Sequence, residues 1–199
     1  MMFAKVYACR IFVVFVLTFV FIGCAAPKHI QMTPITLSLK DGKVFYEKVI
    51  QFQDVPKKEL FMRGRIWAVN VFRDAKQVLQ IEDEKNGQLT GKGIFYLSTD
   101  SYHPVEFTFN IQYKENKYLV QFYDFILRSI NPVAGTEIKR SITDVYENYL
   151  RGTAAKEVFG NQKAAQQRDW RYLFLFQNKV RALAMGLYSY EVGKHDTGF

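Results

Sequence analysis

The feature that most constrains the fold is a strict alternation of apolar and polar residues between Val105 and Lys114. The apolar set is Val105, Phe107, Phe109, Ile111 and Tyr113, and the polar set is Glu106, Thr108, Asn110, Gln112 and Lys114. Successive side chains of a β-strand point to opposite faces, so the pattern predicts a strand with one buried and one solvated face. A sheet of this kind is typically antiparallel, and its apolar face must be covered by another layer.

Four further segments have strand composition, rich in β-branched and aromatic residues. They are residues 44–52, 78–83, 88–98 and 117–128. Asn86-Gly87 supplies a turn between the second and the third of these segments. The segment 117–128 is apolar on both faces, so one face is expected on the core. Its second face, with Tyr123 and Phe125, is a candidate binding surface, and so is the exposed flank of the long helix expected at residues 161–190.

Glycines occupy inward positions of two predicted elements. Gly64 falls on the apolar face of a helix predicted for residues 57–72, which also carries Trp67. A close approach to the sheet explains this glycine, and a kink in the helix is the alternative. Gly91 and Gly93 share one face of the strand 88–98. A phosphate loop would need a helix after them, so a bend or a close approach is the better interpretation.

The C-terminal third is predicted to be helical. Ser141 and Asp144 resemble a capping box at the start of a short helix. Residues 161–190 then form one long helix, whose apolar residues recur every three or four positions. The predicted fold is α+β: a five-stranded antiparallel sheet in the order strand, helix, four strands, helix, with the helices packed on one face. The apolar share of 49% and two cysteines exclude a disordered chain and a disulfide scaffold.

The N-terminus has the form of a secretory signal. Lys5 and Arg10 precede the apolar run 11–22, which is too short to span a bilayer, and Gly23-Cys24 follows. The cysteine resembles the acylated residue of a bacterial lipobox. An uncleaved anchor and an ordinary signal peptide are the alternatives. The expected domains are a lipoprotein signal at 1–23, a tether at 24–40 and an α+β domain with a C-terminal helical extension at 41–199.

The lipobox resemblance also implies a location. No Asp stands directly after Cys24, and in many Gram-negative bacteria such an Asp retains a lipoprotein at the inner membrane. We therefore expect an outer-membrane lipoprotein that faces the periplasm, held by its lipid anchor. Nucleic acid is excluded as a partner mainly by this compartment, although the net charge is +8.

Catalytic and metal-binding motifs are missing from the sequence. The three histidines, His29, His103 and His195, fall in the tether, a loop and the tail. The run Glu82, Asp83 and Glu84 is a weak metal candidate at a hairpin end, where solvated side chains are the simpler interpretation. We expect no catalytic residue, no metal and no cofactor.

Residues 45–97 resemble a family of bacterial lipoproteins known only as a domain of unknown function with a TBP-like fold. The matching residues are Lys57 to Leu60, Trp67, Val78 to Asp83, Gly87, and Gly91 to Gly93. The resemblance implies a helix-grip sheet and no activity, because the family has none assigned. The fold alone does not indicate a function.

Three functions stay open at this point. The first is a non-enzymatic module that binds an envelope protein or polymer. The second is a helix-grip pocket for a small apolar or lipid-like ligand, and the third is a hydrolase with an unconventional site. The sequence favours the first, because its ionisable residues are scattered over the predicted elements.

Overall fold

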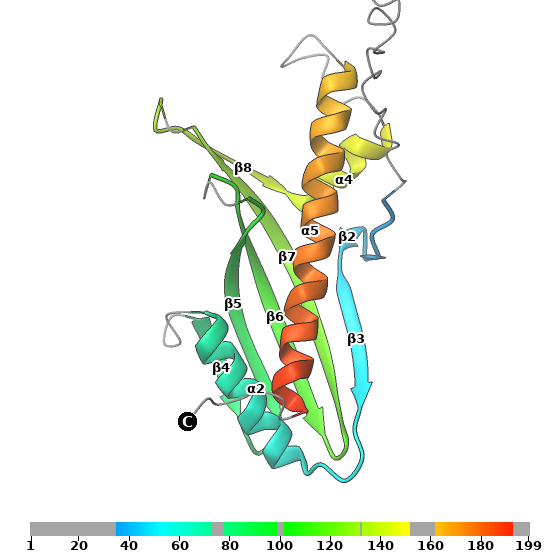
Figure 1. Ribbon diagram of the computed structural model, residues 1–199, viewed down its shortest axis with the longest axis vertical. Helices are drawn as coiled ribbons and strands as arrows, with labels where there is room; N and C mark the ends of the chain where they lie inside the picture. Colours follow the sequence, from blue (N-terminus) through cyan, green and yellow to red (C-terminus); the bar gives the residue numbers. More distant parts are fainter. Residues whose placement is uncertain (1–34, 73–77, 99–101, 132, 152–161, 193–199) are drawn as a thin grey trace, which may run out of the picture. The chain divides into compact units, whose positions relative to one another are not determined.

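The computed structural model describes residues 35–72, 78–98, 102–131, 133–151 and 162–192. The chain divides into residues 1–33 and 34–199, and the fold described here is that of the second unit (Figure 1). Its elements follow in chain order. They are β1 (Leu39–Lys40), β2 (Lys43–Val44), β3 (Tyr46–Gln51), α2 (Lys57–Val71), β4 (Leu79–Asp83), β5 (Gln88–Tyr96), β6 (Pro104–Lys114), β7 (Lys117–Ile130), β8 (Glu137–Ser141), α4 (Ile142–Arg151) and α5 (Gln162–Glu191).

The main sheet is antiparallel throughout, with the strand order β3-β7-β6-β5-β4 and with β8 also paired to β7. The α+β class and the long C-terminal helix are therefore confirmed. The sheet has six strands rather than the predicted five. The long strand β7 pairs with β3 along its first part and with β8 along its last part.

The additional strand, β8, has no apolar alternation that a sequence pattern could reveal. Its one aliphatic residue, Ile138, is 62% exposed. The strand is held instead by its backbone ladder to β7 and by an ion pair between Glu137 and Arg128. A backbone ladder leaves little trace in the order of side chains, which explains why five strands were predicted.

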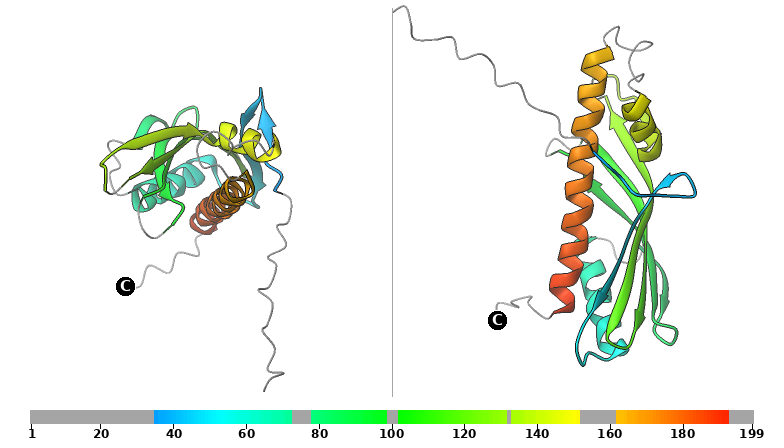
Figure 2. Two further views of the ribbon diagram at one scale, coloured as in Figure 1. Left: turned by 90° about the horizontal axis from the view of Figure 1, so that it is seen from above. Right: turned by 90° about the vertical axis from the view of Figure 1, so that its right-hand side faces the viewer.

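Helices α2 and α5 cover one face of the sheet (Figure 2). The five apolar residues of β6 are all buried under them, as the alternation predicted. Trp67 of α2 is fully buried and meets the ring of Phe109 edge-on at 5.8 Å. The buried row of α5 consists of Leu173, Phe176, Val180, Ala184 and Leu187.

The strand glycines make room for core aromatic rings. A Cβ at Gly93 would lie 2.6 Å from the ring of Phe72 and 2.8 Å from that of Phe107. A Cβ at Gly91 would lie 2.5 Å from the ring of Phe109. Real Cβ atoms are not found so close to other atoms, so a larger residue at either position would displace the rings on which α2 packs.

The segment before the first strand is part of the packed unit. Ile35 is buried, and the backbone N–H of Leu37 donates to the Tyr146 hydroxyl at 3.2 Å. The sequence placed residues 35–40 in the tether. The start of α4 follows the sequence closely, because the N–H of Asp144 donates to the hydroxyl of Ser141 at 2.9 Å, which is the predicted cap.

Candidate functional site

Tyr123 and Phe125, the binding candidates of the sequence, lie on opposite faces of the sheet. Between them Asp124 has a φ of +53°, and the pairing of β7 with β6 shifts register there. This irregularity changes which residues of β7 face the helices. Phe125 is buried and meets Phe176 of α5 at 4.7 Å, whereas Tyr123 is half-buried and stacks on Phe45. The two side chains do not form one surface patch.

The three neighbouring acids bond to separate partners. Glu82 pairs with Arg65 at 2.5 Å, and Glu84 pairs with Lys58 at 3.6 Å. Asp83 accepts hydrogen bonds from the backbone and side-chain N–H groups of Asn86, and these bonds lower the pKa of its carboxyl. Among the described residues, no three His, Cys, Asp or Glu side chains form a group that could hold a metal ion.

The predicted loop histidine contacts the long helix. The Nε2 atom of His103 lies 2.9 Å from the hydroxyl of Tyr172, and the two rings pack together. Its position is therefore fixed by packing on α5. Cys24, His29 and His195 lie outside the described residues. No helix in the described ranges is long and apolar enough to cross a membrane.

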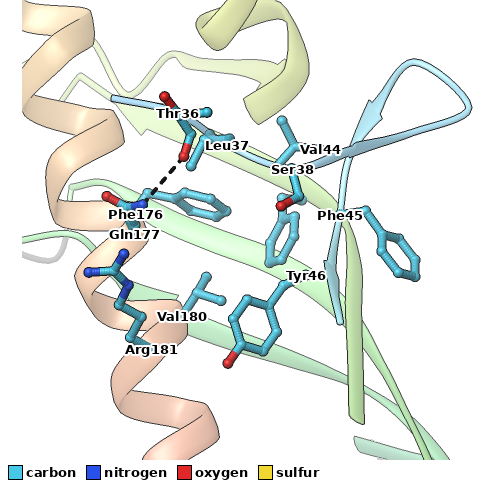
Figure 3. Close-up of a pocket in the computed structure, with 11 residues that line it drawn as sticks. Thr36, Leu37, Ser38, Val44, Phe45, Tyr46, Phe176, Gln177, Val180 and Arg181 are labelled. Atoms are coloured by element: carbon cyan, nitrogen blue, oxygen red, sulfur yellow. Dashed lines mark hydrogen bonds between the residues drawn. The ribbon is translucent and has the colours of Figure 1, made fainter. Parts of the chain in front are cut away.

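A hollow lies between the edge strand β3 and helix α5. Its upper part, of about 230 Å³, is bounded by Thr36 to Ser38, by β3 and by α5. Figure 3 shows Tyr46 reaching from β3 toward the helix, with Val180 and Arg181 on the facing side, while Phe45 points away. At the top, the side-chain amide of Gln177 donates to the carbonyl of Thr36 at 3.4 Å.

The lower part continues along the same strand and helix and has a volume of about 560 Å³. It shares Tyr46 and Arg181 with the upper part, so we treat the two as one site, the β3–α5 groove. The lower part is lined by Tyr46, Lys48, Val49, Ile50 and Gln51 from β3, and by Arg181, Ala184, Met185 and Tyr188 from α5.

The α5 wall of this groove carries exposed apolar side chains. Met185 is 69% exposed and Tyr188 is 45% exposed. Tyr188 also stacks on Phe52 at 6.1 Å, which joins the end of β3 to the helix. Exposed apolar side chains are common on protein surfaces, but these line a concave site, and ligands bind preferentially in clefts with apolar walls.

The charges of the groove are all positive. Lys48 and Arg181 line it, and neither forms an ion pair with any residue that the structure describes. No Asp or Glu lines either part. Burial raises the pKa of the Tyr46 hydroxyl, and the positive charge of Arg181 opposes this rise. The two groups therefore interact electrostatically.

Neither Arg181 nor Lys48 was singled out from the sequence. One feature of the sequence does indicate Lys48. It lies two residues from both Tyr46 and Ile50, so it shares the strand face whose side chains point to the helix layer. A lysine at an inward position of a strand is unusual in an apolar core, and here it opens into the groove.

A second cluster of polar groups is buried where α2, α5 and the sheet meet. Glu191 at the end of α5 is fully buried, and both its carboxylate oxygens lack a hydrogen-bond partner among the described residues, as do the hydroxyls of Tyr113 and Tyr118. Burial raises the pKa of Glu191 to about 8, against the opposing effects of Tyr113 and Arg63. Arg63 donates to the backbone carbonyl of Glu191.

Comparisons with known proteins agree on the fold. Residues 46–127 match the model of a family described as a domain of unknown function (DUF4468) with TBP-like fold. Among solved structures, a TBP-like protein from Parabacteroides distasonis ATCC 8503 aligns with a TM-score of 0.55 and 15% identity, covering 76% of this chain and 96% of that chain. A DUF4468 family protein from Bacteroides ovatus ATCC 8483 aligns with a TM-score of 0.50 and 14% identity, covering 79% of this chain and 91% of that one.

These likenesses confirm the part of the predicted resemblance that concerns a domain of unknown function with a TBP-like fold. At such identities the two structures show a shared fold and nothing about a ligand. None of the curated proteins matches the sequence.

Proposed function

We propose that this chain, whose residues 46–127 match the model of a domain of unknown function with a TBP-like fold, is a non-enzymatic binding module of the cell envelope. It is held at the outer membrane, facing the periplasm, by a lipid on Cys24, and its binding site is the β3–α5 groove. The observation that carries the proposal is the groove itself: about 560 Å³ lined by exposed apolar side chains, with two cations that form no ion pair with any described residue.

The arrangement of the ionisable groups supports binding rather than catalysis. Catalytic groups need mutual hydrogen-bond reach around a space that a substrate can enter. Glu82, Asp83 and Glu84 each bond to a separate partner, and Glu191 is closed off in the protein interior. The groove carries Lys48 and Arg181 but no acid or histidine that could act beside them.

The small apolar ligand considered from the sequence would occupy a different place from the one expected. The layer between α5 and the middle of the sheet is filled by rings, including Phe107, Phe125 and Phe176. The upper part of the groove reaches Phe125 and Phe176 of this layer, and the lower part runs beside the layer along β3. A ligand there would be held between strand edge and helix rather than enclosed beneath the helix.

The test uses anilinonaphthalene sulfonate, an apolar dye with one negative charge, and the folded protein purified in detergent-free form after release from its lipid anchor. We expect a fluorescence increase that Met185→Glu abolishes, because this change adds a negative charge to the wall of the groove. The matched control is Met62→Glu, since Met62 is also an exposed methionine on a helix but lies outside the groove. Equal fluorescence for the two variants would show that the dye does not report on the groove, and the proposal would be withdrawn.

A further inference from the structure

The outer edge of β3, which borders the groove, carries backbone N–H and C=O groups directed away from β7. In an antiparallel pair, residues alternate between those bonded to the neighbouring strand and those directed away from it. The N–H of Phe52 donates to Asn116, next to β7, at 2.8 Å, whereas the N–H of Phe45 donates away from β7, to Ser38, at 2.9 Å. By this alternation, Glu47, Val49 and Gln51 present their N–H and C=O groups to the free edge.

From this edge we infer that the β3–α5 groove binds an extended peptide with an acidic residue, which adds to the sheet as a further strand beside β3. The inference rests on the proposed function and names the class of its partner. An extended peptide suits a bare strand edge, because its own backbone supplies the acceptors and donors that the edge lacks. An alkyl chain would cover those polar groups without satisfying them.

The chain itself provides a short example of this pairing. At the upper end of the groove, Ser38 accepts the outward N–H of Phe45, and Thr36 accepts a hydrogen bond from Gln177 of α5. Residues 36–38 thus connect the start of β3 to α5 at one end of the groove. Below this point the edge of β3 continues without a strand beside it in the described part of the chain. A bound peptide would extend the same arrangement downward.

The charge of the groove selects an acidic peptide. Lys48 projects from the inner face of β3 and Arg181 from the facing side of α5, so an inward-pointing carboxylate between them would meet two cations. The acid closest in sequence, Glu47, projects from the other face, where it accepts a hydrogen bond from Gln121 at 2.7 Å. The expected pattern is an acidic residue with apolar residues two positions before and after it, since alternate side chains share a face.

The test measures binding of an array of fluorescent peptides of about five residues, which span the length of β3. The central residue is Glu, Gln or Lys, and the flanking inward positions are varied among Val, Ile, Leu and Phe. We expect peptides with Glu to bind about tenfold or more tightly than their Gln counterparts, and those with Lys to bind weakest. N-methylation of the backbone amides in the best peptide should abolish binding, because it removes the donors and leaves the side chains unchanged.

Two variants locate the contacts. Arg181→Gln should remove most of the preference for Glu over Gln, while Lys179→Gln, an exposed cation on the same helix outside the groove, should leave it unchanged. Val49→Pro removes one outward N–H and leaves the pairing of β3 with β7 intact, since proline is tolerated at an edge position of this kind. It should weaken peptide binding at an unchanged melting temperature. If Val49→Pro lowers the melting temperature, the N-methylated peptide alone decides the contribution of the backbone.

The outcomes separate the inference from the proposed function. Dye binding that depends on Met185, combined with no peptide bound in the array, would retain the groove as a site and overturn the peptide. Binding that ignores the central charge, or that survives N-methylation, would also overturn it. Displacement of the dye by dodecanoate but not by any peptide would assign the groove to an acidic amphiphile instead.

Discussion

The hydroxyl of Tyr113 occupies the space that a side chain at position 64 would need. A Cβ built on Gly64 would overlap this oxygen, would lie 2.6 Å from Cζ of the same ring, and would lie 3.1 Å from the carboxylate of Glu191. Helix α2 therefore approaches β6 at a distance that only glycine allows. This contact explains why a residue with poor helix propensity stands in the middle of a buried helix face.

We predict that Gly64→Ala destabilises the domain, although alanine is the better helix former. Overpacking of a filled core costs about 1–3 kcal/mol, which outweighs a propensity gain of about 1 kcal/mol. The matched control is Gly186→Ala on α5, where the new Cβ would lie 3.5 Å from Nε1 of Trp67, an ordinary contact distance. Thermal unfolding should show a lower melting temperature for Gly64→Ala only. Equal melting temperatures would contradict the close approach of α2 to the sheet.

Glu191 should make stability depend on pH. Burial raises its pKa from the ordinary value of 4.5 to about 8, so the folded state prefers the neutral acid. The contribution of Glu191 to the free energy of unfolding is fully present below about pH 4.5. It is lost as the pH rises to about 8, and the total loss is a few kcal/mol. The groups that face this carboxyl are Tyr113, Tyr118 and Arg63, and burial raises the pKa of both tyrosine hydroxyls further above 10, outside this range.

The measurement is chemical denaturation at several pH values between these limits. We expect Glu191→Gln to flatten the fall in unfolding free energy across this range, because the amide does not ionise. The control is Glu84→Gln, an exposed acid at the hairpin end, which should keep the slope of the unmodified protein. A slope that persists in Glu191→Gln would assign the pH dependence to other groups.

The sequence predicted most of the fold because its strongest patterns come from burial. The alternation in β6 and the repeat in α5 arise from one buried face each, and the structure buries those residues. The strand β8 escaped prediction because backbone pairing, not burial, holds it in place. The pattern of side chains along a sequence reveals burial but does not reveal backbone pairing.

The candidate site was harder to predict, because it depends on how distant segments meet. Lys48 and Arg181 are far apart in the chain, and only the placement of α5 beside β3 brings them to one groove. The prediction that Tyr123 and Phe125 form one binding surface on β7 was wrong for a local reason. The irregular backbone at Asp124 turns Phe125 to the helix side, and Asp tolerates a positive φ without leaving a clear signal in the sequence.

The two residues separated by Asp124 should therefore respond differently to mutation. Phe125→Ala removes a ring buried between Phe107 and Phe176, and we expect a loss of about 3–5 kcal/mol in unfolding free energy. Tyr123→Ala removes a half-buried ring that stacks on Phe45, so a smaller loss is expected. Denaturant titration of both variants measures the difference. Similar losses would mean that the two rings share one face after all.

The anchor proposed at Cys24 leads to the last prediction. The chain has two cysteines, Cys9 and Cys24, and Cys24 follows the apolar run at the position that resembles a lipobox. More than one acyl chain is needed for stable attachment to a membrane, so loss of acylation should release the domain or leave the precursor unprocessed. Cys24→Ser should abolish labelling by a clickable fatty acid, and Cys9→Ser should retain it. Label that persists in Cys24→Ser, or that disappears in Cys9→Ser, would contradict acylation at Cys24 and, with it, the proposed attachment to the outer membrane.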